Sequence, residues 1–320
     1  MLLSFVCSFV VAAASAAAAQ DWVSGPALVP VKVAIVSRTV FYVPLWIAAR
    51  AGLFRGAGLD VSIEVFDNAE KISDALRSGA VQIAISTPEG AILDALRGGN
   101  QRIVAGNAEK LPHFVIAKPS IATPEQLRGA TFGVLSLNEG TTYLVHAYAR
   151  SVGLREGDYQ IKQVGGAPTR WRLLKEGVID VGLQPFPLSY EAEAAGFNNL
   201  GPLSRVVPEW QFTSVNVDRR WAEANRATVG RFLRALAKGQ GTMQSQPDLA
   251  IEIAAAELRT SPELARRALD DTRALRILSA DLSPSREGLR MVFQSLIATN
   301  QLPHDAAFDM ARFVDVSYLE

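Results

Sequence analysis

Apolar residues occupy alternate positions over residues 31–35, a spacing that predicts a β-strand with one covered face. Pro44 suits the first turn of a following helix, because its missing N–H group needs no partner there. Gly52 marks the end of that helix, and apolar positions return over residues 59–65 as a second strand. Strand, helix and strand in this order predict a βαβ unit, and such folds hold ligands at the carboxyl end of the first strand.

The same order of strand, loop and helix recurs as far as residue 217. Apolar runs predict further strands over residues 81–85, 102–105, 114–117, 131–135, 159–164, 178–183 and 212–217. Helical spacing predicts helices over residues 44–51, 69–78, 88–97, 141–152, 169–175 and 188–195. Residues 219–320 show mainly helical spacing. This alternation predicts an α/β protein with mainly parallel sheets.

Four segments of the chain resemble, in the right order, elements of one protein family. The segment PLWIAARAGLFRGAGLDV (44–61) resembles the first helix and second strand of periplasmic solute-binding proteins related to nitrate, aliphatic-sulfonate and thiamine-precursor binders, the SsuA/THI5-like group. The later segments ISDALRSGAVQIAIS, IATPEQLRGATFGV and RLLKEGVIDVGLQPFP resemble further elements of the same family. The resemblance covers residues 30–320.

The resemblance implies a two-lobed periplasmic binding protein fold of type II, each lobe a mainly parallel sheet flanked by helices. Residues 30–117 and 214–320 would form the first lobe, and residues 118–213 the second. Two crossover segments, near Lys118 and Thr213, would join the lobes and act as their hinge.

The resemblance also implies a function. Such a protein captures a small organic solute and delivers it to the membrane permease of an ABC importer, whose partner subunits hydrolyse ATP. We expect a monomer without a cofactor. One alternative is a THI5-like enzyme of pyrimidine synthesis, which uses a cysteine-rich iron site and a cofactor-bearing lysine, whereas this chain has one cysteine, Cys7. Another is a ligand sensor for a membrane receptor.

Composition narrows these classes. The 320 residues are 49% hydrophobic and 20% charged, and the formal net charge is +0 at pH 7, which argues against a nucleic-acid partner. The three histidines, His113, His146 and His304, have no metal-ligand spacing, so we expect no metal site. The sequence contains no G-x-S-x-G element and no Walker loop, and we expect no catalytic residues.

Residues 1–20 form an apolar run that ends in small residues, which predicts a signal peptide cleaved near Ala19 and a periplasmic protein. No Lys or Arg precedes the run, which is unusual for such a leader. Cys7 lies too early in the run for a lipoprotein site. Removal of the leader would leave a chain without any thiol.

The candidate ligand-binding residues lie in loops that follow the predicted strands or at the helix starts behind them. The first lobe contributes Ser37, Arg38, Thr39, Phe41, Tyr42, Ser86, Thr87 and Asn107. The second lobe contributes Asn138, Gly140, Thr141, Thr142, Gln184 and Phe186. The alternative is turn chemistry alone, because Ser, Thr, Asn and Gly favour turns for backbone reasons.

Arg38 is the expected cation of the cleft, since arginine binds a carboxylate or sulfonate through two parallel hydrogen bonds. A solvated arginine or an interlobe salt bridge is its alternative. Thr141 stands at a helix start that either binds an anion or is merely capped. Glu139 opposes an anion there and either points to solvent or meets a ligand amine. With the aromatic loop residues, these features favour an aromatic carboxylate, a sulfonate or a pyrimidine.

Overall fold

The computed structural model describes residues 27–320, so the expected signal peptide lies outside the described residues. The strands are β1 (Val29–Ile35), β2 (Leu59–Val65), β3 (Ile83–Ser86), β4 (Gln101–Ala108), β5 (His113–Ala117), β6 (Thr131–Val134), β7 (Gln160–Gln163), β8 (Val181–Pro185), β9 (Asn198–Pro202) and β10 (Thr213–Asp218).

The α-helices up to the last strand are α1 (Val43–Arg50), α2 (Leu53–Gly56), α3 (Ala69–Ser78), α4 (Glu89–Leu96), α5 (Gly140–Ser151), α6 (Ala167–Lys175) and α7 (Leu188–Ala194). The later ones are α8 (Arg219–Ala224), α9 (Arg226–Ser245), α10 (Pro247–Leu258), α11 (Pro262–Ala274) and α12 (Arg286–Ala298). Short 3-10 turns are η1 (Val40–Tyr42), η2 (Pro124–Leu127), η3 (Leu203–Arg205) and η4 (Met310–Arg312).

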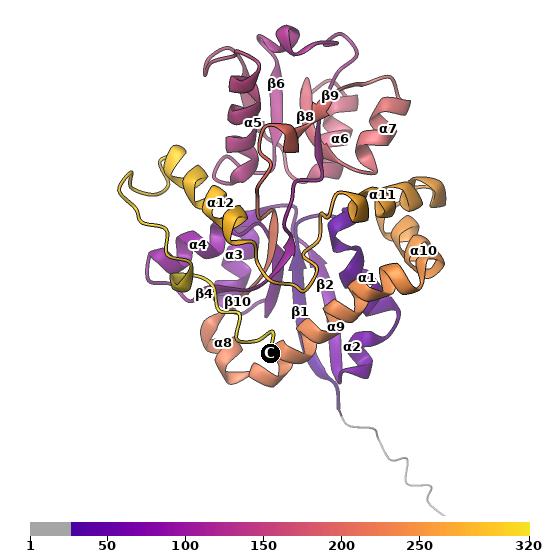
Figure 1. The fold of residues 1–320 in the computed structure, drawn as a ribbon, viewed down its shortest axis with the longest axis vertical. Helices are drawn as coiled ribbons and strands as arrows, with labels where there is room; N and C mark the ends of the chain where they lie inside the picture. Colours follow the sequence, from indigo (N-terminus) through magenta and orange to yellow (C-terminus); the bar gives the residue numbers. More distant parts are fainter. Residues whose placement is uncertain (1–26) are drawn as a thin grey trace, which may run out of the picture.

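Two five-stranded sheets define two lobes. The first lobe is built on the order β2-β1-β3-β10-β4, and the second on the order β7-β6-β8-β5-β9. In the first sheet β1 runs parallel to β2 and β3, and β10 lies antiparallel between β3 and β4. In the second, β6 runs parallel to β7 and β8, and β5 lies antiparallel between β8 and β9. Figure 1 shows the second lobe above the first. The predicted fold class is confirmed.

The chain crosses between the sheets twice, over residues 109–112 and residues 203–212. Residues 114–117 are expected from the sequence in the first lobe, but β5 is hydrogen-bonded to β8 and β9 of the second sheet. The reason is that β5 enters the second sheet antiparallel, directly from the crossing, and needs no helix before it. The other bounds proposed for the lobes stay a prediction.

The predicted strands and helices are present with shifts of a few residues at their ends, and β2 and α3 have the predicted bounds. One strand, β9, was not predicted. It is short and polar, with the sequence NNLGP, so it lacks the apolar alternation that identifies a strand. Its register against β5 is also irregular.

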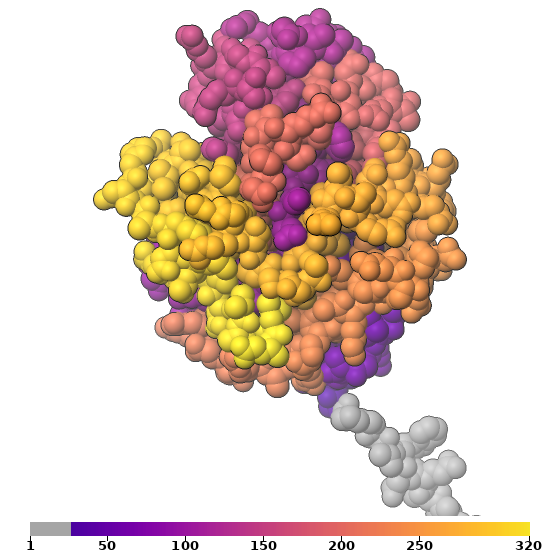
Figure 2. Space-filling model, viewed as in Figure 1, coloured from indigo at the N-terminus to yellow at the C-terminus, as the bar shows by residue number. Residues whose placement is uncertain are grey.

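The C-terminal helices surround the crossings. Helices α9 and α10 pack on α1 of the first lobe, and α12 lies between α4 of the first lobe and α5 of the second. The tail returns to the first sheet, where Val314 bridges to Ile103 of β4. Figure 2 shows this orange-to-yellow part of the chain on both sides of the second crossing, beneath the second lobe. None of the helices within residues 27–320 combines the length and apolar character that a bilayer crossing would need.

Candidate functional site

The ends of the central strands of both sheets meet around a small hollow, which we call the central cavity. Its volume is about 20 Å³, roughly the room for a single water molecule. The first lobe lines it with Val36, Ser37, Phe41, Tyr42 and Thr87. The second lobe lines it with Leu135, Thr141, Gly166, Ala167 and Arg170, the second crossing adds Phe212, and the start of β10 adds Thr213. Both lobes therefore contribute to one site, and here they are closed on it.

The first-lobe wall is aromatic and fixed by buried hydrogen bonds. The Tyr42 hydroxyl accepts from the Val36 N–H (3.3 Å) and donates to the Ile85 carbonyl (3.1 Å). Its burial raises the pKa of Tyr42 above the ordinary value, so the phenol stays neutral. Asn107 donates to the Phe41 carbonyl (3.0 Å) and thereby ties the aromatic loop to β4. The rings of Phe41 and Tyr42 lie with their centroids 4.7 Å apart.

Arg170 of α6 provides the positive charge of the second-lobe wall. Its guanidinium donates to the Gly165 carbonyl (3.0 Å) and to the Leu183 carbonyl (2.8 Å), while its Nε has no partner within the described structure. Only 3% of the residue is exposed, and burial lowers the pKa of Arg170 to about 10. It remains a cation at neutral pH, with one N–H group unsatisfied beside the cavity.

Two buried carboxyl groups, those of Glu89 and Glu139, lie next to Thr87 and Thr141. Glu89 of α4 accepts the Gly140 N–H (3.0 Å) at the start of α5, and Glu139 accepts the Thr141 hydroxyl. Burial raises the pKa of Glu89 to about 7. Burial, and then the charge of Glu89, raise the pKa of Glu139 well above its usual range, and Arg170 offsets this only in part.

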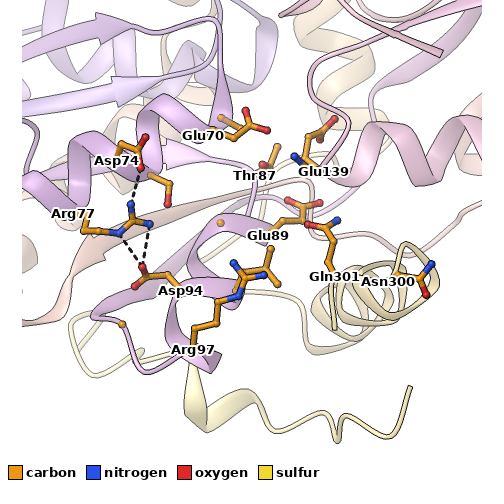
Figure 3. A pocket seen from close by; sticks show the side chains of 16 residues that line it. Glu70, Asp74, Arg77, Thr87, Glu89, Asp94, Arg97, Glu139, Asn300 and Gln301 are labelled. Atoms are coloured by element: carbon orange, nitrogen blue, oxygen red, sulfur yellow. Dashed lines mark hydrogen bonds and ion pairs between the residues drawn. The ribbon is translucent and has the colours of Figure 1, made fainter. Parts of the chain in front are cut away.

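These carboxyl groups line an open hollow between the lobes, which we call the acidic pocket. Its volume is about 610 Å³, and Thr87 lines both this pocket and the central cavity. Figure 3 shows Glu70, Glu89 and Glu139 around one end of it. At the other end Arg77 forms ion pairs with Asp74 (2.6 Å) and Asp94 (3.3 Å).

A second contact between the lobes lies at the start of α6. Asp67 of the first lobe accepts the Gly166 N–H (2.5 Å) and the Thr169 hydroxyl (3.0 Å). A side chain at Gly166 would meet Asp67 Oδ1 at 2.6 Å and Ser37 Cβ at 3.0 Å, so a larger residue there would displace the Asp67 side chain. Asp67 thus caps a helix of the opposite lobe.

The two crossings meet in an aromatic cluster behind the central cavity. The ring of Phe212, on the second crossing, contacts Phe41 edge-on with centroids 5.0 Å apart, and His113, at the start of β5, with centroids 4.7 Å apart. Burial lowers the pKa of His113 well below its usual value, and the charge of Arg170 adds to this. Trp210 stacks on Tyr143 of α5 at 5.8 Å. The hinge region is therefore packed against both lobes.

Five of the predicted site residues line the central cavity: Ser37, Phe41, Tyr42, Thr87 and Thr141. Arg38, Thr39 and Phe186 line a neighbouring hollow of about 320 Å³, which we call the side pocket and which shares Ser37 with the cavity. The Arg38 guanidinium pairs there with Glu257 of α10. Asn138 lines the acidic pocket.

The remaining predicted residues form hydrogen bonds within the framework, and of these bonds only that of Gly140 joins the two lobes. Gly140 donates to Glu89, and the Thr142 hydroxyl donates to the Ser136 carbonyl (3.0 Å). Ser86 accepts from Asn216 of β10 (3.0 Å), and Asn107 also donates to Thr213 (2.9 Å). The Gln184 amide fits between the Ala167 carbonyl and the Trp171 N–H, where it would secure α6 to β8.

Sequence reasoning missed Arg170, Glu89, Asp67 and Phe212. Arg170 follows the loop Gly165–Gly166 by one helical turn. A cation in this position, one turn after a cleft loop, was the sequence feature that could have identified it. Glu89 and Asp67 follow strands of the first sheet, but an acidic residue at a helix start is also what capping and the helix dipole favour. Within residues 27–320, no group of three or more His, Cys, Asp or Glu side chains could hold a metal ion.

Solved structures with the same fold include three that each match about nine-tenths of this chain. A protein of Bordetella bronchiseptica RB50 superposes with a TM-score of 0.75 at 20% identity, covering 91% of this chain and 95% of its own. The ligand-binding component of an ABC-type import system from Staphylococcus aureus, with zinc bound, gives 0.74 at 13% identity, with 91% and 98% coverage. The alkanesulfonate-binding protein SsuA of Xanthomonas axonopodis pv. citri, bound to MOPS, gives 0.71 at 15% identity, with 91% and 99% coverage.

Sequence comparison also finds a relative in Bacillus subtilis (strain 168), named "Putative binding protein YtlA", which is 31% identical over 111 residues. The match spans about a third of this chain and a third of that protein. The family model described as "NMT1/THI5 like" matches residues 41–250, well over half of the chain, and confirms the resemblance stated from the sequence. The chain belongs to the NMT1/THI5-like family.

Proposed function

We propose that this protein is the solute-binding component of an ABC importer, that it captures a small organic solute between its lobes, and that it does so in the periplasm. The observation that carries the proposal is the central cavity, to which both lobes and the second crossing contribute. The structural relatives support it, because one is a ligand-binding component of an ABC-type import system and another an alkanesulfonate-binding protein. A membrane permease would be the partner that receives the solute.

Capture requires the lobes to part. A cavity of about 20 Å³ is too small for any organic solute, so the closed state must open or stay slightly wider around its ligand. Rotation about the two crossings would provide this movement. A ligand favours closure only by binding the closed form more tightly than the open one. Residues that meet from both lobes are therefore the proposed ligand contacts: Ser37, Phe41, Tyr42, Thr87, Thr141 and Arg170.

The proposed solute is small and carries an anionic group, as a carboxylate or sulfonate does. Arg170 supports this, because its buried guanidinium keeps an unpartnered Nε–H beside the cavity in the described structure. The rings of Phe41 and Tyr42 would stack on a flat solute, as in an aromatic carboxylate or a pyrimidine. We assign no catalytic step to the site. The THI5-like enzyme remains the alternative, and turnover of the bound solute would favour it.

Native mass spectrometry of protein purified without refolding tests this proposal. We expect one small solute per chain, released intact on denaturation. Arg170→Gln should weaken binding of that solute by about 1.5–3 kcal/mol, the usual range for a hydrogen bond to a charged group. Arg38→Gln, which removes one of the two arginines paired with Glu257, is the matched variant and should retain binding.

Because Arg170 is buried, its variant could fail to fold, so thermal unfolding is measured alongside. Thr141→Val provides a second, milder change to the same wall. If Arg38→Gln loses the solute while folded Arg170→Gln keeps it, the side pocket is the site. If no solute co-purifies and no carboxylate or sulfonate binds, the capture function is contradicted.

A further inference from the structure

The acidic pocket presents carboxyl groups that the proposed anion-binding role does not use. Glu89 is 2% exposed, and its Oε2 has no hydrogen-bond partner within the described structure. Glu139, from the opposite lobe, is 4% exposed. Glu70 accepts the Ser136 hydroxyl through one oxygen, and its other oxygen is buried without a partner there. Figure 3 shows these three side chains around the same end of the pocket.

No basic side chain of the described residues forms an ion pair with these three carboxyl groups, and the charge of Arg170 acts on Glu139 without neutralising it. The Arg77 guanidinium is already engaged by Asp74 and Asp94 at the far end. Arg97 lines the pocket but forms no ion pair with any of the three carboxyl groups in the part of the chain described. Two buried carboxyl groups placed together either keep a proton or take a cation.

The pair is built into the structure. The Gly140 N–H holds Glu89 in place, and a side chain at Gly140 would come within 2.5 Å of Glu89 Oε1 and 2.4 Å of the Trp210 ring. Thr141 donates to Glu139 and also lines the central cavity, so Glu139 lies one hydrogen bond away from the proposed anion site. The acidic pocket is open to solvent and offers a route for a cation to reach the pair.

We propose that Glu89 and Glu139 form a subsite for a protonated amine, so that the solute is zwitterionic, with its anionic group at Arg170 and its ammonium group between the two carboxylates. The inference rests on the proposed function. An organic ammonium fits better than a metal ion, because no group of three or more His, Cys, Asp or Glu side chains among the described residues could hold a metal. The carboxylates come from opposite lobes, so an ammonium between them would also draw the lobes together.

Calorimetric titration with matched pairs of small molecules tests the subsite. The probes are 3-aminopropanesulfonate against propanesulfonate, 4-aminobutanoate against butanoate, and 4-(aminomethyl)benzoate against 4-methylbenzoate. In at least one pair the ammonium member should bind about tenfold tighter or more, as expected for charge-assisted hydrogen bonds. Glu89→Gln and Glu139→Gln should each reduce this preference at least several-fold, since they keep the shape and remove the charge. Glu64→Gln should leave it unchanged, because Glu64 is paired with Lys32 and its side chain is 43% exposed.

The outcomes separate this subsite from the capture function. Equal binding of the two members in every pair that binds, or a co-purified solute without a basic nitrogen, overturns the ammonium subsite and leaves solute capture standing. A preference that survives both Gln variants also overturns it, because the ammonium must then lie elsewhere. If no probe binds and no solute co-purifies, both proposals fail. Thermal unfolding of each variant confirms that lost binding is not lost folding.

Discussion

Two contacts between the lobes have the same form and opposite surroundings. At each, a carboxylate of the first lobe accepts an N–H group at the start of a second-lobe helix: Asp67 from Gly166, just before α6, and Glu89 from Gly140, the first residue of α5. Asp67 is exposed, so water can replace its contact when the lobes part. Glu89 is buried, and burial raises its pKa to about 7. The comparison shows what burial changes. An exposed interlobe carboxylate only accepts hydrogen bonds, whereas a buried one also needs a proton or a cation.

The largest effect should come from Gly140→Ala, which disrupts the buried contact between Gly140 and Glu89. The added methyl group would lie 2.4 Å from Trp210 and 2.5 Å from Glu89 Oε1, and neither can move freely inside the closed hinge. We expect a loss of about 2–3 kcal/mol in the free energy of unfolding, measured by urea titration.

The control for this change is Gly241→Ala in α9, where nothing lies within 4 Å of the added methyl group. It should leave stability unchanged or raise it by up to about 1 kcal/mol, because alanine favours a helix over glycine. A Gly140→Ala protein as stable as wild type would show that the α5 start and the hinge are not packed as described.

An intermediate effect should appear in the pH dependence of stability. The buried Glu89 carboxyl keeps its proton up to about pH 7, whereas an unfolded glutamate loses it near its ordinary value of 4.5. The folded state therefore holds more protons between these values, and the free energy of unfolding should fall as pH rises through that window, by about 3 kcal/mol in total. Glu139, whose pKa is also raised, acts in the same direction.

Glu89→Gln should flatten this part of the profile, since the amide does not titrate. Chemical unfolding at several pH values between 4.5 and 7.5 measures the slope. Glu64→Gln, at a half-exposed ion pair with Lys32, should keep the wild-type slope. Stability that rises over this window in wild type would contradict the buried placement of Glu89.

The smallest effect should come from Asp67→Asn at the exposed contact. Asp67 has φ 51°, a conformation that asparagine also tolerates, so the change removes the charge without adding backbone strain. We expect a loss of less than about 1 kcal/mol, because exposed charges contribute little and the amide oxygen still accepts a hydrogen bond. A loss equal to that of Gly140→Ala would remove the distinction between the two contacts.

The sequence predicted most of the fold because apolar alternation and glycine stops are local signals. It placed Ser37, Tyr42 and Thr141 in the cleft, since the carboxyl ends of strands face it in any fold of this kind. The sequence could not show that Arg170, and not Arg38, lines the central cavity. Whether a loop arginine finds a partner such as Glu257 depends on a helix more than 200 residues away.

Burial was the other property that the sequence did not reveal. The sequence did not decide whether Glu139 points to solvent or meets a ligand amine. In the structure, where the two lobes approach each other, it is 4% exposed. Glu89 gave no signal, because its position at a helix start is typical of an ordinary solvated glutamate. Strand β5 changed lobe for a related reason: the partners of a strand are set by topology, and its own residues suit either sheet.

The place of β10 has a consequence for the order in which the molecule folds. The second sheet uses only residues 113–202, a contiguous stretch, and can assemble as soon as that stretch is available. In the first sheet β4 reaches β3 only through β10, so this sheet stays divided until residues 213–218 arrive. Pairing across such long sequence separations is slow, because the loop must close before any contact forms. We therefore expect the lobe that begins the chain to be the last to complete its sheet.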